Sequence, residues 1–311
     1  MWGYYLPTVS SAWTRTDRSS AVGLSSNAGK IGDTEDRADT ACGWYLYGII
    51  QQPPSSDAWA STALLPHNSE AIQILQHTGV AAVVRSVRLA DYEPETLRAH
   101  MRDADWLETM ARHHHRVIES IHRQRPILPA TFGCVYPDAD GLRAALSELR
   151  EALLARLAWV ADCDEWTVHL YAESNALKQR LILEHPGLQH IQREIDSVPP
   201  GRAYLLKRKL AGEIENVMDY AATELAEKEF GRIRPVTRAG MVQTLDPIAH
   251  DRQGELEILR AVFLVPRPDV TAFQRAVEEI ASQDGGIRAE YSGPWPPYSF
   301  ARLDMERDGD G

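Results

Sequence analysis

The sequence has few cysteines and no long hydrophobic run. Its 311 residues contain Cys42, Cys134 and Cys163, an odd number with wide spacings and no C-x-x-C pair. This excludes a disulfide framework and a cysteine zinc site as the means of holding the fold. No stretch approaches the roughly 18 apolar residues that a membrane-spanning helix needs, and the first residues lack the pattern of a secretory signal. We therefore expect a cytoplasmic protein with reduced thiols.

Basic residues are also in short supply. The chain has 33 Lys and Arg against 44 Asp and Glu, which gives a formal net charge of −11. A surface of this sign repels nucleic acids and anionic membranes unless a local basic patch intervenes. The densest basic stretch, Lys207-Arg208-Lys209, is typical of a solvated helix face. We expect neither a nucleic-acid nor a membrane partner.

Motifs of catalysis and cofactor binding are missing. The sequence has no G-x-S-x-G, H-E-x-x-H, P-loop or G-x-G-x-x-G pattern, so we expect no cofactor, no metal and no enzyme activity. Three consecutive histidines, His113, His114 and His115, point about 100° apart on a helix and do not converge on one metal ion. His114 shares the apolar helix face and is interpreted as a core histidine. A small metal-dependent hydrolase that uses His114 or His115 stays open as an alternative.

The pattern along the chain predicts two α+β domains between two tails. Residues 1–42 and 304–311 are polar and are predicted to be disordered. Residues 43–162 form the N-terminal domain, with strands expected at 44–50, 80–84 and 128–136 and helices at 107–121 and from Asp140, as the cap, to Leu157. The second domain spans 163–303.

The second domain has the element order of a ferredoxin-like fold. Strands are expected at 166–171, 233–242, 255–265 and 287–291, and helices at 177–195, 206–225 and 270–280, the last capped by Asp269. The order is β-α-β-β-α-β with an extra helical segment after the first strand. Such a sheet carries helices on one face only, so we expect its other face to be open to a partner.

A proline-rich aromatic segment follows the last strand. Gly293-Pro294-Trp295-Pro296-Pro297-Tyr298-Ser299-Phe300 holds three aromatics among three prolines. Prolines remove backbone donors, so the segment is not expected to extend the sheet. We interpret it as a stiff strap that closes the C-terminal domain, and a partner anchor is the alternative. The candidate structural or partner-binding residues are Trp295, Pro296, Pro297, Tyr298, Phe300, Tyr291 and His114.

Four segments resemble one known family. Tyr291–Phe300 resembles the Y-x-G-P-W-P-P-Y-S-F pattern of the gas vesicle proteins GvpF and GvpL, and Trp44–Ile50 resembles their opening strand. The helix with Trp106-Leu107 and His114 is also similar, as is Pro126–Tyr136, although Ala130-Thr131 replaces a bulkier residue and an arginine that are usual there. The matches follow the order of the family over about residues 43–303.

The resemblance implies a role in gas vesicle assembly and not catalysis. It implies contact with the small hydrophobic shell subunit, GvpA, and with other gas vesicle accessory proteins, as a minor shell component or an assembly factor. An aggregation-prone subunit needs its apolar surface shielded, and we expect the C-terminal domain, about residues 164–303, to bind it through the open sheet face beside the strap. A regulatory binding module unrelated to vesicles is the remaining alternative.

Overall fold

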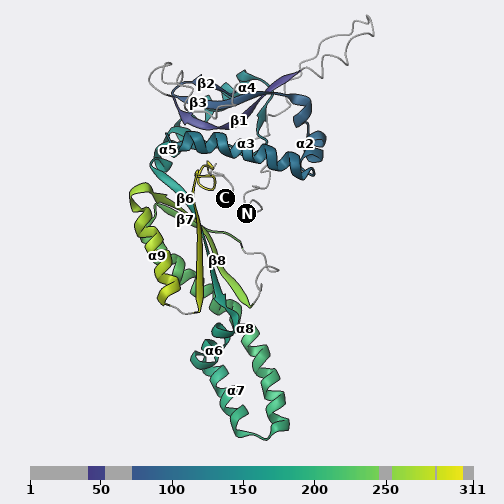
Figure 1. Ribbon diagram of the computed structural model, residues 1–311, viewed down its shortest axis with the longest axis vertical. Helices are drawn as coiled ribbons and strands as arrows, with labels where there is room; N and C mark the ends of the chain where they lie inside the picture. The colour runs from purple at the N-terminus through teal and green to yellow at the C-terminus, as the bar shows by residue number, and fades with distance from the viewer. Residues whose placement is uncertain (1–40, 53–71, 245–253, 284–285, 304–311) are drawn as a thin grey trace, which may run out of the picture. The chain divides into compact units, whose positions relative to one another are not determined.

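The computed structural model describes residues 41–52, 72–244, 254–283 and 286–303 (Figure 1). The predicted tails lie outside these residues, except that Cys42 already begins the first strand. The chain divides into two compact units. Unit 1 comprises residues 1–162 and 296–311, and unit 2 comprises residues 163–295. The expected C-terminal domain therefore ends at Trp295 and not at residue 303, because the segment after Trp295 belongs with unit 1.

The sheet of unit 1 is antiparallel and has the strand order β2-β3-β1-β4, with β5 also paired to β1. Its strands are β1 (Cys42–Gln51), β2 (Ile72–His77), β3 (Val80–Arg88), β4 (Ile127–Pro129) and β5 (Val135–Tyr136). The single strand expected at 128–136 is wrong. It is two short strands separated by a turn in which Gly133 adopts a φ of +81°, a conformation that glycine permits.

The helices of unit 1 cover both faces of this sheet. They are α2 (Pro94–His100), α3 (Ala104–His122), α4 (Ala139–Glu148) and α5 (Arg150–Val160), and Figure 1 shows α3 and α4 on opposite sides. Tyr45 and Tyr47 of β1 pack with Val117 and Ile121 of α3, while the alternate residue Leu46 is also buried and α5 contacts β1. Cover on both sides explains why β1 is apolar throughout.

Two details of α4 and α5 differ from the prediction. The cap of α4 is Asp138, whose side chain accepts a hydrogen bond of 2.7 Å from the Gly141 amide, and not Asp140. The expected single helix is also divided at Leu149, which adopts non-helical angles between α4 and α5. The leucine stripe nevertheless stays buried, because Leu142, Leu146, Leu153 and Leu157 are each at most 3% exposed.

Unit 2 contains an antiparallel four-stranded sheet in the order β7-β8-β6-β9. Its strands are β6 (Cys163–Glu173), β7 (Ala239–Val242), β8 (Glu255–Pro266) and β9 (Ile287–Trp295). Contrary to the prediction, β9 runs through Gly293 and Pro294, and Trp295 still pairs with Glu165 beyond a register shift. Pro294 is tolerated because β9 lies at the edge of the sheet and is irregular at that point.

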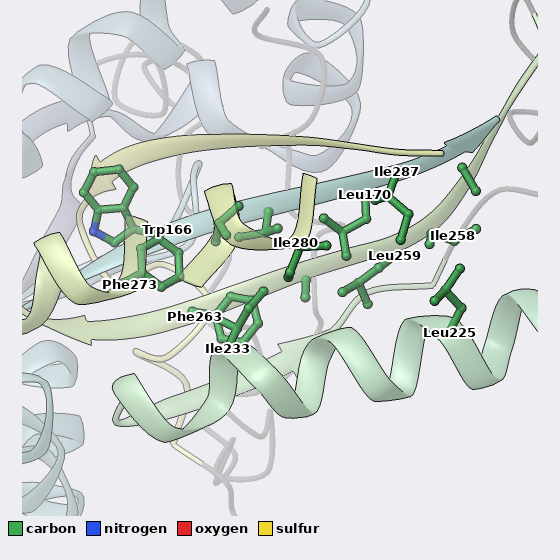
Figure 2. Close-up of a cluster of buried hydrophobic side chains, with 14 of the residues drawn as sticks. Trp166, Leu170, Leu225, Ile233, Ile258, Leu259, Phe263, Phe273, Ile280 and Ile287 are labelled. Carbon is green, nitrogen blue, oxygen red and sulfur yellow. The ribbon is translucent and has the colours of Figure 1, made fainter. Parts of the chain in front are cut away.

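The helices of unit 2 are α6 (Ser174–Glu184), α7 (Pro186–Ser197), α8 (Pro200–Ile233) and α9 (Val270–Gln283). Figure 2 shows one apolar cluster in which Phe273 of α9 lies beside Trp166 of β6, Ile233 of α8 beside Phe263 of β8, and Leu225 of α8 near Ile258 of β8. The strand expected from residue 233 begins at Ala239 instead, since α8 continues to Ile233.

The first part of α8 packs on α7 away from this core. Leu188, Ile191 and Ile195 of α7 form a second cluster with Leu210 and Ile214 of α8, and Figure 1 shows the two helices side by side. The apolar positions that predicted one long helix therefore pack in two separate clusters, the first part of α8 against α7 and the last part against the sheet. Among the described helices, none combines the length and hydropathy that crossing a membrane requires.

Candidate functional site

Each of the three consecutive histidines of α3 is paired with a different tyrosine hydroxyl. His114 Nδ1 lies 2.8 Å from Tyr45 Oη, His113 Nε2 lies 2.8 Å from Tyr47 Oη, and His115 Nδ1 lies 2.8 Å from the hydroxyl of Tyr298. Tyr45 and Tyr47 sit two residues apart on β1 and therefore share a face. The divergence of the three histidines around the helix lets them reach partners in different directions.

His114 is a neutral histidine in the core of unit 1. It is 5% exposed, and its ring meets Phe132 edge-on at a centroid distance of 5.6 Å. Burial lowers its pKa to about 3, and a hydrogen bond with the backbone of Ala130 only partly opposes that effect. The neighbouring Tyr45 has its pKa raised well above 10, also by burial. The pair is thus uncharged near neutral pH.

The proline-aromatic strap is split between the two units. Pro296, Pro297 and Phe300 are buried, and Tyr298 packs on the apolar cluster of unit 1. The ring of Phe300 lies 6.0 Å from that of Trp159 of α5. The prediction that the strap closes the C-terminal domain is therefore wrong for residues 296–300. The sequence shows that this segment is stiff and aromatic, but it does not show which core receives the rings.

Trp295 and Tyr291 remain in unit 2. The Trp295 indole nitrogen donates to Ser292 Oγ over 3.4 Å, and the ring of Tyr291 lies 5.9 Å from Trp166. Gly293 lies between them with a φ of +152°, and a Cβ at this position would come within 2.7 Å of the Trp166 ring. Glycine is required here because the backbone lies directly against an indole.

The hydrolase alternative receives no support from these positions. Within the described residues no group of three or more His, Cys, Asp or Glu side chains is placed to hold a metal ion. His113, His114 and His115 instead each face a tyrosine. Their geometry fits a structural network more closely than a set of converging ligands.

Contrary to the prediction, the face of the unit 2 sheet opposite its helices is not open throughout, because Thr167 of β6 and Val262 and Leu264 of β8 on that face are buried. Near the start of β8 the same face carries charged side chains. His169 and Tyr171 of β6 lie on this face. They alternate along the strand with Val168 and Leu170, which are buried on the other face. Glu257 Oε1 lies 2.8 Å from His169 Nδ1, and Glu257 Oε2 accepts a hydrogen bond of 2.6 Å from Arg260. Burial alone raises the pKa of Glu257, but the hydrogen bonds from Arg260 and His169 outweigh it and lower the pKa.

A second ionic group adjoins the first. Arg288 donates to Glu255 over 2.6 Å, also contacts Glu290, and lies 4.2 Å above the ring of Tyr171. These side chains line an open depression of about 740 Å³ together with Glu173. The accessible end of this face is thus ionic, and it does not offer the apolar surface that shielding a hydrophobic subunit needs.

Sequence reasoning missed these side chains although the signal is present. Residues 168–173 read Val-His-Leu-Tyr-Ala-Glu, a strict alternation of apolar and polar residues. This alternation is typical of a strand with one buried and one solvated face. Tyr45 and Tyr47 give no such signal, because β1 is apolar on both faces and its sequence does not mark the two hydroxyls as partners of the α3 histidines.

Comparison with known proteins identifies relatives over most of the chain. The sequence model of the family described as "Gas vesicle synthesis protein GvpL/GvpF" matches residues 43–302. The chain is 28% identical over 234 residues to gas vesicle protein L of Streptomyces sp. (strain CB03234), covering 75% of this chain and 84% of the relative. It is 26% identical over 258 residues to gas vesicle protein F of the same strain, covering 82% and 98%.

Solved structures agree in fold. The crystal structure of the gas vesicle protein GvpF from Anabaena sp. PCC7120 superposes with a TM-score of 0.60 at 20% identity, over 84% of this chain and 98% of that chain. GvpF from Microcystis aeruginosa gives a TM-score of 0.53 at 17% identity, over 84% and 99%. With the family match extending over both units, the chain belongs to the GvpL/GvpF family of gas vesicle proteins.

Proposed function

We propose that this protein binds the small hydrophobic shell subunit, GvpA, through unit 2 and aids gas vesicle assembly without catalysis. It acts in the cytoplasm at the gas vesicle, beside other accessory proteins, as a minor shell component or an assembly factor. One observation carries the assignment to unit 2. Among the described residues, the exposed large apolar side chains all belong to this unit, namely Leu183, Tyr204, Leu205, Tyr220, Met241 and Val242.

The edge strand β7 offers the contact that suits a hydrophobic subunit best. Within the described part of the chain β7 pairs on one side only, with β8. Met241 is 41% and Val242 61% exposed. An edge strand with apolar side chains is a template for strand addition, in which backbone hydrogen bonds supply affinity and side chains supply selectivity. A strand of the shell subunit is the occupant that this edge favours.

Placing a charge on this edge should weaken binding. A pull-down of tagged full-length protein co-expressed with GvpA is expected to recover about tenfold less GvpA for Val242→Lys, since an ammonium group in an apolar contact is poorly tolerated. Leu183→Lys is the matched control, because Leu183 is 72% exposed in the same unit but lies on α6. It should recover GvpA as the wild type does.

Two outcomes of this pull-down distinguish a wrong binding surface from a wrong binding partner. If Leu183→Lys lost GvpA and Val242→Lys kept it, the β7 edge would be the wrong surface. If the wild-type protein recovered no GvpA while its fold was intact, the proposed partner itself would be wrong.

We also propose that unit 2 is a ferredoxin-like domain with an added helical hairpin. Support comes from the element order β6, helices, β7, β8, α9, β9 and from the strand order β7-β8-β6-β9, with both helical segments contributing to one core. An experimental structure with β7 outside this sheet, or with α8 and α9 on opposite faces, would contradict the assignment.

A further inference from the structure

The charges along α8 run in the order opposite to the one that stabilises an isolated helix. Residues 200–212 contain four basic and no acidic side chains, whereas residues 213–229 contain six acidic and one basic side chain. A helix favours acidic residues at its amino end and basic residues at its carboxyl end, because the backbone dipole is positive at the former. Helix stability therefore does not account for this arrangement.

Some of these charges lie on or beside a helix face that no described element covers, with Arg208 and Asp219 on the face and Lys209 and Glu215 on its flanks. Leu205, Arg208, Gly212, Asn216 and Asp219 are all exposed and recur at steps of three and four, so they share one face. The buried side chains of α8 that pack on α7 lie on the opposite face. Among the described residues, Lys207, Arg208 and Lys209 form no ion pair, in contrast to Arg202, which contacts Glu194 of α7 over 3.2 Å.

We propose that this exposed face of α8 binds the same face of a second copy of the chain, with the two helices antiparallel. In that orientation the basic part of each helix meets the acidic part of the other, and the two dipoles oppose. A parallel pair would instead place like charges together. The pairing is self-complementary, as a two-fold interface requires.

The spacing of the charges defines a register. With the two-fold axis between Ala211 and Gly212, Arg208 lies level with Glu215 of the second copy, because both residues are equally far from the axis, and this contact occurs twice. Gly212 has open space around the position of a Cβ, although glycine costs a helix interior about 0.5–1 kcal/mol relative to alanine. A small residue at the centre permits close approach of the two backbones.

A second copy fits this surface better than lipid or nucleic acid does. The same helix face continues into Asp219, with Glu215 on its flank, and the whole chain carries a formal charge of −11. A polyanion that approached the basic part would meet this acidic part next to it. Only a partner with both signs in reverse order satisfies the full length of the face, and the chain itself supplies one.

Charge reversal on full-length protein tests the proposal. Sedimentation equilibrium at low ionic strength should show a monomer–dimer equilibrium for the wild type, which weakens at about 1 M salt, where the Debye length falls to about 3 Å. Arg208→Glu alone and Glu215→Arg alone should each weaken dimerisation by at least about tenfold, because each creates two like-charge contacts. Arg275→Glu, an equal charge change on the exposed face of α9, should have no effect.

Mixing the two single variants gives the decisive result. The Arg208→Glu chain and the Glu215→Arg chain are complementary to each other in the antiparallel register, so the mixture should form a one-to-one heterodimer. The same pairing is restored in the double variant. A wild-type protein that stays monomeric at all concentrations would overturn the proposal. So would a dimer that both single variants leave intact, or a monomer that binds anionic vesicles through Arg208.

Discussion

Replacing Phe300 with alanine should lower the free energy of unfolding of unit 1 by about 3–5 kcal/mol. Phe300 is 4% exposed and its ring lies against Trp159. Truncation leaves a cavity beside α5 and removes an aromatic contact that anchors residues 296–300. Hydrogen exchange of the Ile49 and Ile50 amides in β1 reads the stability of this unit by itself. Their protection factors should fall by at least about a hundredfold, since each 1.4 kcal/mol is tenfold.

A conservative variant separates packing from a general disturbance. Phe300→Leu keeps most of the buried volume and should cost less than about 1.5 kcal/mol. Equal protection of β1 in the wild type and in Phe300→Ala would mean that the strap is not part of the core of unit 1.

Unit 1 should lose stability steeply as the pH falls below about 6.5, because of His114. Its pKa is about 3 in the folded state and about 6.5 in an unfolded chain. Between these values the unfolded state binds more protons, so folding becomes less favourable as the pH falls. This single group accounts for a loss of about 3 kcal/mol between pH 7 and about pH 4, and chemical denaturation across that range measures it.

A variant that cannot take up the proton isolates this contribution. His114→Gln keeps a polar side chain that does not titrate, so its stability should depend less on pH than that of the wild type by about 3 kcal/mol over the same range. The carboxylates titrate equally in both proteins and cancel in the difference. Parallel curves for the two proteins would show that His114 is not held neutral by burial.

The apolar pattern of the sequence predicted the elements that are long and well buried. β1, β3, α3, β8 and α9 were all expected within a few residues of their observed bounds, because their apolar positions repeat without interruption. β2 was missed, and its burial pattern explains why: every one of its residues is at least partly exposed. β2 is held mainly by its backbone hydrogen bonds to β3, so its sequence shows little of the apolar pattern that predicts a buried strand.

The candidate sites were harder to predict, for a different reason. The three histidines and the strap were recognised as unusual, but their tyrosine partners lie 66, 69 and 183 residues away in sequence. Local pattern contains no information on such distant pairs. The basic stretch 207–209 was interpreted as a solvated helix face, and only the continuous helix α8 of the structure places it ahead of the acidic residues that follow.

The division of the strap between two units bears on how the protein is made. Residues 41–162 leave the ribosome first, yet the ring that completes their core, Phe300, is translated after the whole of unit 2. The amino-terminal unit is therefore the first to be synthesised and the last to be finished. A chain that ends before residue 300 lacks this ring, so its unit 1 should be less stable than that of the chain that contains it.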